Sequence, residues 1–283
     1  MRRLTLNLIG CGRVGKTLAR AWHLSDALAV QDVLTSAPAS AQAAVDWVGA
    51  GHACTHLNDL RAADVWMIAV PDRLIAQTAI DLAALRPAPA ARGWTPTVFH
   101  CSGALSTQAL APLRDVGWRV ASAHCILSFA DPEKALQQLA GTPCGLEGDA
   151  PAAQQLAPLF SGLGLKCFEV SADNKLLYHA AAVFATNFAP VLQAVAEDLW
   201  LNSGVPAELL PTLRATLLQN AVNNLLALGP QGALTGPAAR GDVALVAQQA
   251  AALAAWDERS SQAYQALSEL AGRLARTGQI KAT

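Results

Sequence analysis

The chain has 283 residues, enough for one large domain or two ordinary ones with a sizeable core. Hydrophobic residues make up 53% of it and charged residues only 14%, so we expect much helical surface to be buried between subunits. The formal net charge of -1 gives no long-range attraction to nucleic acid or to an anionic membrane, and it argues against both as partners.

The six cysteines are scattered, with no C-x-x-C pair and no His–Cys cluster, which predicts free thiols and no metal site. The first apolar strand begins too early for a signal peptide. The apolar stretch at 180–196 contains Thr186, Asn187, Pro190 and Gln193, which argues against a membrane span. We therefore expect a soluble, cytoplasmic protein.

An apolar strand over residues 4–9 leads into a Gly-x-Gly-x-x-Gly turn and then into a helix. Gly10 allows the tight turn, Gly12 lets the backbone approach a phosphate, and Gly15 lets the helix pack on the strand. The helix N-terminus adds unpaired N–H groups and a partial positive charge. The pattern predicts a Rossmann fold whose diphosphate-binding residues are Gly10, Cys11, Gly12, Arg13, Val14 and Gly15.

Strand-like and helix-like segments then alternate as far as residue 171, which is typical of a doubly wound parallel sheet. Later strands are expected at 28–35, 53–55, 63–70, 97–103 (including a turn), 119–124, 142–147 and 166–170.

From residue 172 the chain is Ala- and Leu-rich and helical in pattern. Pro190 should kink the first of these helices near Thr186, and the apolar spacing over 245–274 predicts one amphipathic helix. The fold class is thus α/β: a Rossmann domain over 1–171 followed by an all-α dimerisation domain over 172–283.

The end of the second strand indicates the nucleotide. Asp32 has the spacing of the carboxylate that holds the ribose 2′-hydroxyl of NAD, but three strand-like residues follow it, so its side chain should not reach the ribose. The strand tip is Thr35-Ser36, a neutral pair that accepts a 2′-phosphate, and this favours NADP over NAD. Arg13 is either a source of positive charge for that phosphate or a solvated surface arginine.

Two further strands end in residues suited to the border of a nucleotide site. Ligands in open α/β sheets lie outside the carboxyl ends of the strands, so we expect Val70, Pro71, Asp72, Ser102 and Gly103 to border the ribose and nicotinamide. Ordinary turn chemistry is the alternative for Pro71 and Gly103, and capping of the next helix is the alternative for Asp72.

Five segments together resemble one known group of proteins: residues 10–15, 69–72, 100–103, 124–129 and 232–242. The group consists of Rossmann-like NADP oxidoreductases with a C-terminal helical domain of unknown function. It is similar to pyrroline-5-carboxylate reductase, deazaflavin-dependent NADP reductase and hydroxyisobutyrate dehydrogenase. The resemblance implies an NADP-binding domain, a helical domain that dimerises, and a site between them. The group's usual Ser-Arg-Ser after the second strand is replaced here by Thr35-Ser36-Ala37.

Five residues are candidates for the chemistry. His124 ends a strand and is a proton donor or a structural histidine. Lys175 matches the catalytic lysine of the hydroxyisobutyrate-type relatives, and His179 stands where that pattern has asparagine, one helical turn further on. Asn187 reaches their helix face only through a kink and otherwise satisfies the broken backbone. Arg240 binds a substrate anion or braces its loop with Asp242.

The sequence thus predicts an NADP-dependent oxidoreductase that transfers hydride to a carbonyl or imine of a small anionic metabolite in an interdomain cleft. It leaves the proton donor open among His124, Lys175 and His179. The alternatives are a dimer that binds or senses NADP(H) without catalysis, and a structural dimer that binds nothing.

Overall fold

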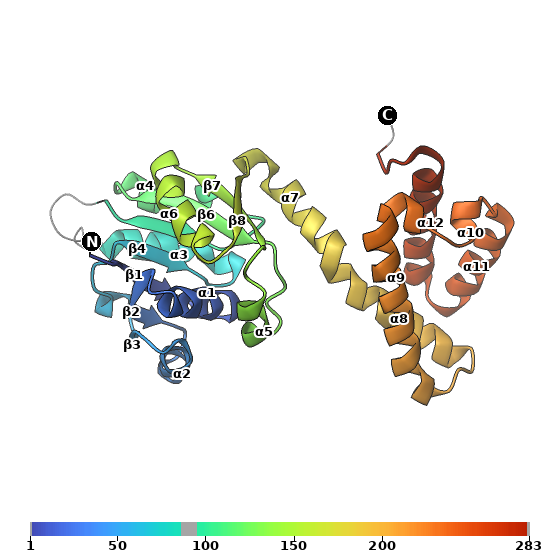
Figure 1. Ribbon diagram of the computed structural model, residues 1–283, viewed down its shortest axis with the longest axis horizontal. Helices are drawn as coiled ribbons and strands as arrows, with labels where there is room; N and C mark the ends of the chain where they lie inside the picture. Colours follow the sequence, from blue (N-terminus) through green and yellow to red (C-terminus); the bar gives the residue numbers. More distant parts are fainter. Residues whose placement is uncertain (1, 86–94, 282–283) are drawn as a thin grey trace. The chain divides into compact units, whose positions relative to one another are not determined.

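A computed structural model of the protein describes residues 2–85 and 95–281. The chain divides into two compact units, Met1–Asn187 and Phe188–Thr283. The first is an eight-stranded sheet with helices on its faces, and the second is entirely helical in its described part (Figure 1).

The eight strands of the sheet are those that the sequence predicted, in the order β3-β2-β1-β4-β5-β6-β7-β8. Neighbouring strands are parallel except β6 and β7, which are antiparallel, so the last two strands run against the others. The chain reverses its direction of travel across the sheet between β1 and β4, where an open α/β sheet binds its ligands. The strands are β1 (Leu4–Ile9), β2 (Leu28–Leu34), β3 (His52–Cys54), β4 (Val65–Ile68), β5 (Thr97–His100), β6 (Arg119–Cys125), β7 (Pro143–Gly148) and β8 (Lys166–Glu169).

Two apolar cores hold helices against the two faces of the sheet. One core packs Trp22, Phe99 and Phe160 edge to face, and it joins the sheet to α1, α2 and α6. The other packs Trp66 against Trp118 beneath α3 and α4. The helices of this unit are α1 (Arg13–Leu24), α2 (Pro38–Val48), α3 (Asp72–Leu85), α4 (Ala111–Asp115), α5 (Pro132–Gln137), α6 (Ala150–Ser161) and α7 (Lys175–Ala182).

After β8 every described element is helical, as the change of composition at residue 172 predicted. The first compact unit nevertheless extends beyond that point, because α7 packs on the sheet through Lys175 and Tyr178. A π-helical turn, Val183–Asn187, closes the unit. The domain boundary at 171/172 stays a prediction.

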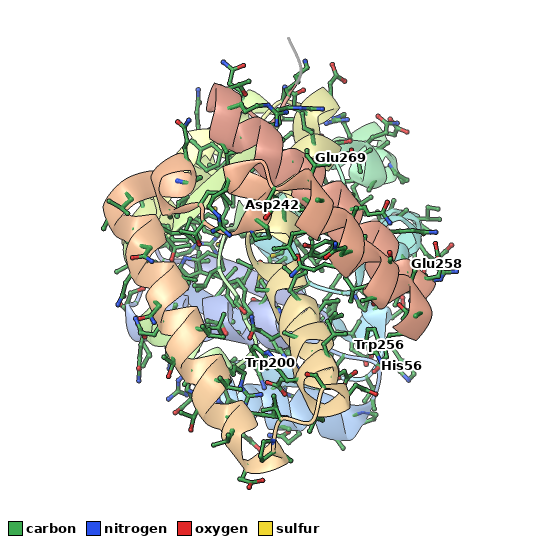
Figure 2. The ribbon with its side chains drawn as sticks, turned by 90° about the vertical axis from the view of Figure 1, so that its right-hand side faces the viewer. His56, Trp200, Asp242, Trp256, Glu258 and Glu269 are labelled. Atoms are coloured by element: carbon green, nitrogen blue, oxygen red, sulfur yellow. The ribbon has the colours of Figure 1, made fainter. Side chains whose placement is uncertain are left out.

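The second unit contains α8 (Phe188–Asn202), α9 (Leu210–Ala233), α10 (Pro237–Arg240), α11 (Val243–Trp256) and α12 (Glu258–Thr277). The prediction of a single amphipathic helix over 245–274 was wrong. Asp257 takes an extended conformation, which ends α11, and its carboxylate accepts a hydrogen bond from the Ser260 amide, which caps α12. Asp242 caps α11 in the same way. Asp242 and Glu269 line a hollow of about 470 Å³ in this unit (Figure 2).

Within the described residues, the helical stretch 172–202 is long and apolar enough to pass as a membrane span by length and composition. An apolar helix of a soluble protein passes the same test. The first turns of this stretch attach to the sheet through the buried Lys175, and our prediction that it does not cross a membrane remains a prediction.

Candidate functional site

The three glycines of the first turn have three different surroundings. Gly10 has a φ of +81°, and a Cβ there would lie 2.7 Å from the carbonyl carbon of Ala69. A Cβ on Gly15 would lie 2.9 Å from the Cβ of Ala69 and 3.1 Å from the Gly10 oxygen. Gly10 therefore makes the turn and Gly15 allows α1 to lie against β4, as the sequence predicted.

Gly12 differs because a Cβ there would meet nothing within 4 Å. It is the N-cap of α1, with φ −70° and ψ −163°, and no side chain caps the helix. The first turn of α1 also contains no acidic residue. An uncapped helix N-terminus beside open space is suited to a phosphate group, so the residues present here fit a dinucleotide diphosphate.

Gly12 lies on the wall of a cleft of about 620 Å³ in the first unit. We call this space the cleft. Its wall comes from the start of α1, the carboxyl ends of β4, β5 and β6, the loop at 127–130, α7 and the π-helical turn. The predicted site residues that line it are Gly12, Arg13, Val14, Val70, Pro71, Asp72, Ser102, Gly103, His124, His179 and Asn187.

The remaining predicted site residues do not line the cleft. Gly10 and Cys11 lie in the turn before α1, Gly15 lies within α1, and Thr35 and Ser36 follow β2. Lys175 points into the interior of the first unit. Arg240 ends α10 in the second unit, and no ion pair joins it to Asp242 among the described residues.

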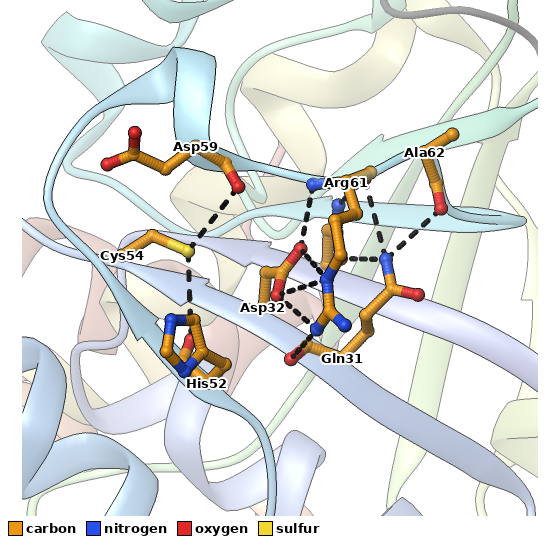
Figure 3. Close-up of polar contacts among 8 residues, drawn as sticks. Gln31, Asp32, His52, Cys54, Asp59, Arg61 and Ala62 are labelled. Carbon is orange, nitrogen blue, oxygen red and sulfur yellow. Dashed lines mark hydrogen bonds and ion pairs between the residues drawn. The ribbon is translucent and has the colours of Figure 1, made fainter.

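Asp32 is engaged within the protein (Figure 3). Its side chain is fully buried, and its carboxylate accepts hydrogen bonds from the Arg61 amide at 2.8 Å and from the Arg61 guanidinium at 2.6 Å. This confirms that Asp32 sits within the strand and not at its tip. At the tip, the Thr35 hydroxyl donates to the Ala37 carbonyl at 2.9 Å.

The Ser102 hydroxyl has no hydrogen-bonding capacity left for a ligand. It donates to Asp72 Oδ2 at 2.6 Å and accepts from the amides of Ala104 and Leu105. The Ser102 amide donates to His100 Nδ1 at 3.2 Å, and the Ser102 carbonyl accepts from Lys175 Nζ at 2.9 Å. A serine hydroxyl has one hydrogen and two lone pairs, so Ser102 serves to hold the loop after β5. Asp72 anchors that loop because its carboxylate accepts the Ser102 hydrogen bond, and among the described residues it caps no amide of α3.

Three aromatic side chains meet where this loop reaches the cleft. His124 Nδ1 lies 2.8 Å from the Tyr178 hydroxyl, and the rings of His124 and His179 stand edge to face with centroids 5.6 Å apart. Gly103 is pressed against both histidines, because a Cβ on it would lie 2.6 Å from His179 Nδ1 and 2.8 Å from His124 Nε2. His179 Nδ1 is buried and has no hydrogen-bond partner within the described chain.

Burial keeps the side chains of His124 and Tyr178 neutral. Desolvation, with a smaller effect of the Lys175 charge, lowers the pKa of His124 to about 4. Desolvation also raises the pKa of Tyr178 to about 12. At neutral pH the cleft therefore contains an uncharged imidazole whose Nδ1 contacts a protonated phenol.

Asn187 reaches the cleft by a route different from a simple kink. His179 and Asn187 are eight positions apart, so a straight α-helix would separate their directions by about 80°. The π-helical turn at Val183–Asn187 absorbs one extra residue, which rotates the following side chains by about 100° and returns Asn187 to within about 20° of the His179 face.

Tyr178 is the site residue that the sequence analysis missed. It occupies the helix position three residues after Lys175, and that i, i+3 spacing was the available signal. A lone tyrosine among leucines reads as a core residue until its partner is known, and the partner, His124, is distant in sequence.

Residues 1–124 match the family model of a Rossmann-like domain, and residues 142–271 match that of a domain of unknown function, DUF2520. The chain thus combines these two domains, which confirms the resemblance drawn from its motifs. No curated protein sequence is significantly similar to it.

Three solved structures share the fold over nearly the whole chain. A Thermotoga maritima protein is 24% identical, with 96% of this chain and 99% of that one covered and a TM-score of 0.73. A Bacteroides fragilis protein named as a candidate NADP oxidoreductase is 19% identical, with 96% and 98% covered and a TM-score of 0.75. Plasmodium falciparum pyrroline carboxylate reductase, solved with NADP bound, is 12% identical, with 96% and 99% covered and a TM-score of 0.59. At these identities the likeness shows the fold alone.

Proposed function

We propose that the protein is an NADP-dependent oxidoreductase that reduces a carbonyl or imine of a small anionic metabolite. The observation that carries the proposal is the open space at Gly12, at the uncapped N-terminus of α1, on the wall of a cleft that also contains His124 and His179. A diphosphate fits the first feature, and a polar reacting group fits the second.

Three observations support NADP over NAD. Asp32 is buried and paired with Arg61, so it is not free to bind a ribose hydroxyl. The tip of β2 carries the neutral Thr35 and Ser36. Arg13 lines the cleft and adds positive charge beside the turn. A carboxylate at the strand tip would repel a 2′-phosphate, whereas these groups do not. Two of the structures that share the fold carry NADP in their names.

When NADP is bound, its reduced nicotinamide supplies a hydride. Tyr178 stays protonated. In the tautomer that we propose, its hydroxyl donates to His124 Nδ1 and the ring proton of His124 lies on Nε2. Nε2 lies beside Gly103 on the cleft wall, from where its N–H polarises a substrate oxygen or nitrogen. A neutral imidazole suits this role, since it donates a hydrogen bond without adding charge. His179 Nδ1 provides a second group without an internal partner.

Arg240 is the group we propose for the substrate's anion, because a guanidinium binds a carboxylate with two parallel hydrogen bonds. We also propose that the protein is a cytoplasmic homodimer that associates through its helical unit. That unit exposes large apolar side chains along α8 and α9, among them Val191, Leu217, Leu226 and Leu228.

The experiment has two steps. Calorimetric titration with NADPH, NADP⁺ and NADH measures whether a dinucleotide binds and which one binds best. Absorbance assays with a panel of keto acids, aldehydes and cyclic imines then follow the oxidation of NADPH. We expect micromolar or tighter binding of NADPH and turnover of at least one compound. Tight binding with no turnover of any panel member would favour the sensing alternative, and no binding of any dinucleotide would refute the proposal.

A further inference from the structure

Lys175 is a buried lysine that does not line the cleft. It is the first residue of α7, and only 2% of its surface is exposed. Its ammonium donates to the Ser102 carbonyl at 2.9 Å and to the Ser122 hydroxyl at 2.9 Å. Both acceptors are groups of the protein, and Lys175 is not among the residues that line the cleft.

The charge of Lys175 is balanced through a bridging side chain. Ser122 donates to Glu147 Oε2 at 3.1 Å, and the Glu147 carboxylate also accepts from the amide and hydroxyl of Thr107. Burial lowers the pKa of Lys175, and the nearby Glu147 and Asp72 charges oppose that shift. The pair thus keeps an ammonium inside the protein, although burial of an isolated charge is unfavourable.

The Ser102 carbonyl links this buried pair to the cleft. Ser102 is held at its hydroxyl by Asp72 and at its carbonyl by Lys175. The next residue, Gly103, lies so close to the rings of His124 and His179 that a Cβ on Gly103 would clash with both. A shift of the backbone at 102–103 therefore moves both histidines or leaves a gap beside them.

We propose that Lys175 is a positioning residue: its hydrogen bond to the Ser102 carbonyl fixes Gly103 against the two histidine rings. Its role as proton donor, which the resemblance to hydroxyisobutyrate dehydrogenase implied, is replaced by this one. The inference rests on the proposed function only in that the cleft is taken as the binding site. The placement of the rings is testable in the protein without cofactor.

The test compares Lys175→Met with the double variant Lys175→Met/Glu147→Gln. The single variant leaves the Glu147 carboxylate buried without its counter-charge and should melt at a lower temperature. The double variant removes both charges and should regain part of that loss, yet it still lacks the bond to Ser102. Lys166→Met, which removes an exposed lysine of β8, is the matched control.

Two further measurements are made on the folded variants. The first is the NMR ring resonances of His124 and His179 in the protein without cofactor. The second is the NADPH dissociation constant measured by calorimetry. We expect both variants of Lys175 to shift the ring resonances and to weaken NADPH binding about tenfold, which is the effect of losing one charge-assisted hydrogen bond. The control should change neither readout.

The proposal would be overturned if the folded double variant kept wild-type ring resonances and wild-type NADPH affinity. Loss of turnover in such a variant would identify Lys175 as the proton donor instead. Failure of the wild-type protein to bind NADPH would refute the proposed function while leaving the ring resonances to decide the role of Lys175.

Discussion

The sharpest test of the diphosphate site compares the same substitution at two glycines of one turn. Gly12 and Gly15 are three residues apart, but an added Cβ meets nothing within 4 Å at Gly12 and meets Ala69 Cβ at 2.9 Å at Gly15. Gly12→Ala should therefore impair binding without impairing folding. Gly15→Ala should impair folding.

The magnitudes follow from the local geometry. Alanine can adopt the backbone angles of Gly12 without strain. Gly12→Ala therefore stabilises the folded state by about 0.4–1 kcal/mol, because it reduces the conformational freedom of the unfolded chain. Alanine is also a poorer N-cap than glycine by a similar amount, and the net change should stay within about 0.5 kcal/mol. At Gly15, overpacking costs about 1–3 kcal/mol against a helix-propensity gain of about 1 kcal/mol. The net loss of roughly 0–2 kcal/mol lowers the melting temperature by up to roughly 8 °C.

Binding is measured separately by calorimetric titration with NADPH. The new methyl group of Gly12→Ala occupies the approach of the diphosphate to the α1 amides. Loss of one charge-assisted hydrogen bond weakens binding about 10- to 100-fold. Gly15→Ala should bind NADPH normally at temperatures below its melting transition. If Gly12→Ala bound NADPH as tightly as the wild type, no diphosphate would lie at this helix N-terminus and the reasoning would be refuted.

Three further outcomes are expected. Ser36→Asp places a carboxylate at the tip of β2 and should shift the calorimetric preference from NADPH towards NADH, whereas unchanged selectivity would exclude this tip from the 2′-phosphate site. Burial lowers the pKa of His100 to about 4, below the unfolded value near 6.5. The contribution of neutral His100 to the free energy of unfolding is therefore fully present above pH 6.5 and falls by about 3 kcal/mol towards pH 4. Urea unfolding across this range should show a shallower pH dependence in His100→Asn than in the wild type, and an equal slope would contradict this role of His100. Leu226 is 83% exposed on α9, and Leu226→Asp should lower the mass measured by light scattering from dimer to monomer, unless the helical unit does not dimerise.

The strands were predictable because most of them are continuous apolar runs. A strand covered on both faces needs no alternation, and residues such as those of β4, all buried, show this directly. Proline and glycine mark where such runs end, as Pro71 does after β4 and Gly103 after β5. The reversed direction of β7 was not predictable, because a strand's residues are the same in either orientation and only its partner defines the ladder.

The surroundings of charged side chains were less predictable. Helical spacing placed Lys175 and His179 one turn apart, and this suggested that both would face a substrate. In the structure only His179 lines the cleft, because Ser122 and Glu147 on β6 and β7 supply a hydrogen-bonded place for the ammonium inside the first unit. Contacts of that kind join positions far apart in sequence, and no local pattern reports them.

The path of the chain into the second unit was predictable only in part. Pro190 has no amide hydrogen to donate to the Thr186 carbonyl, so the sequence predicted an irregularity there. It did not predict the form, a π-helical turn in which the Thr186 hydroxyl donates to the Ala182 carbonyl at 2.9 Å. The form matters because a kink bends a helix axis, whereas one absorbed residue rotates every side chain beyond it by about 100°. Asn187 therefore lines the cleft because of the added residue, and removing one residue from the turn would rotate its amide away from His179 even if the helix remained intact.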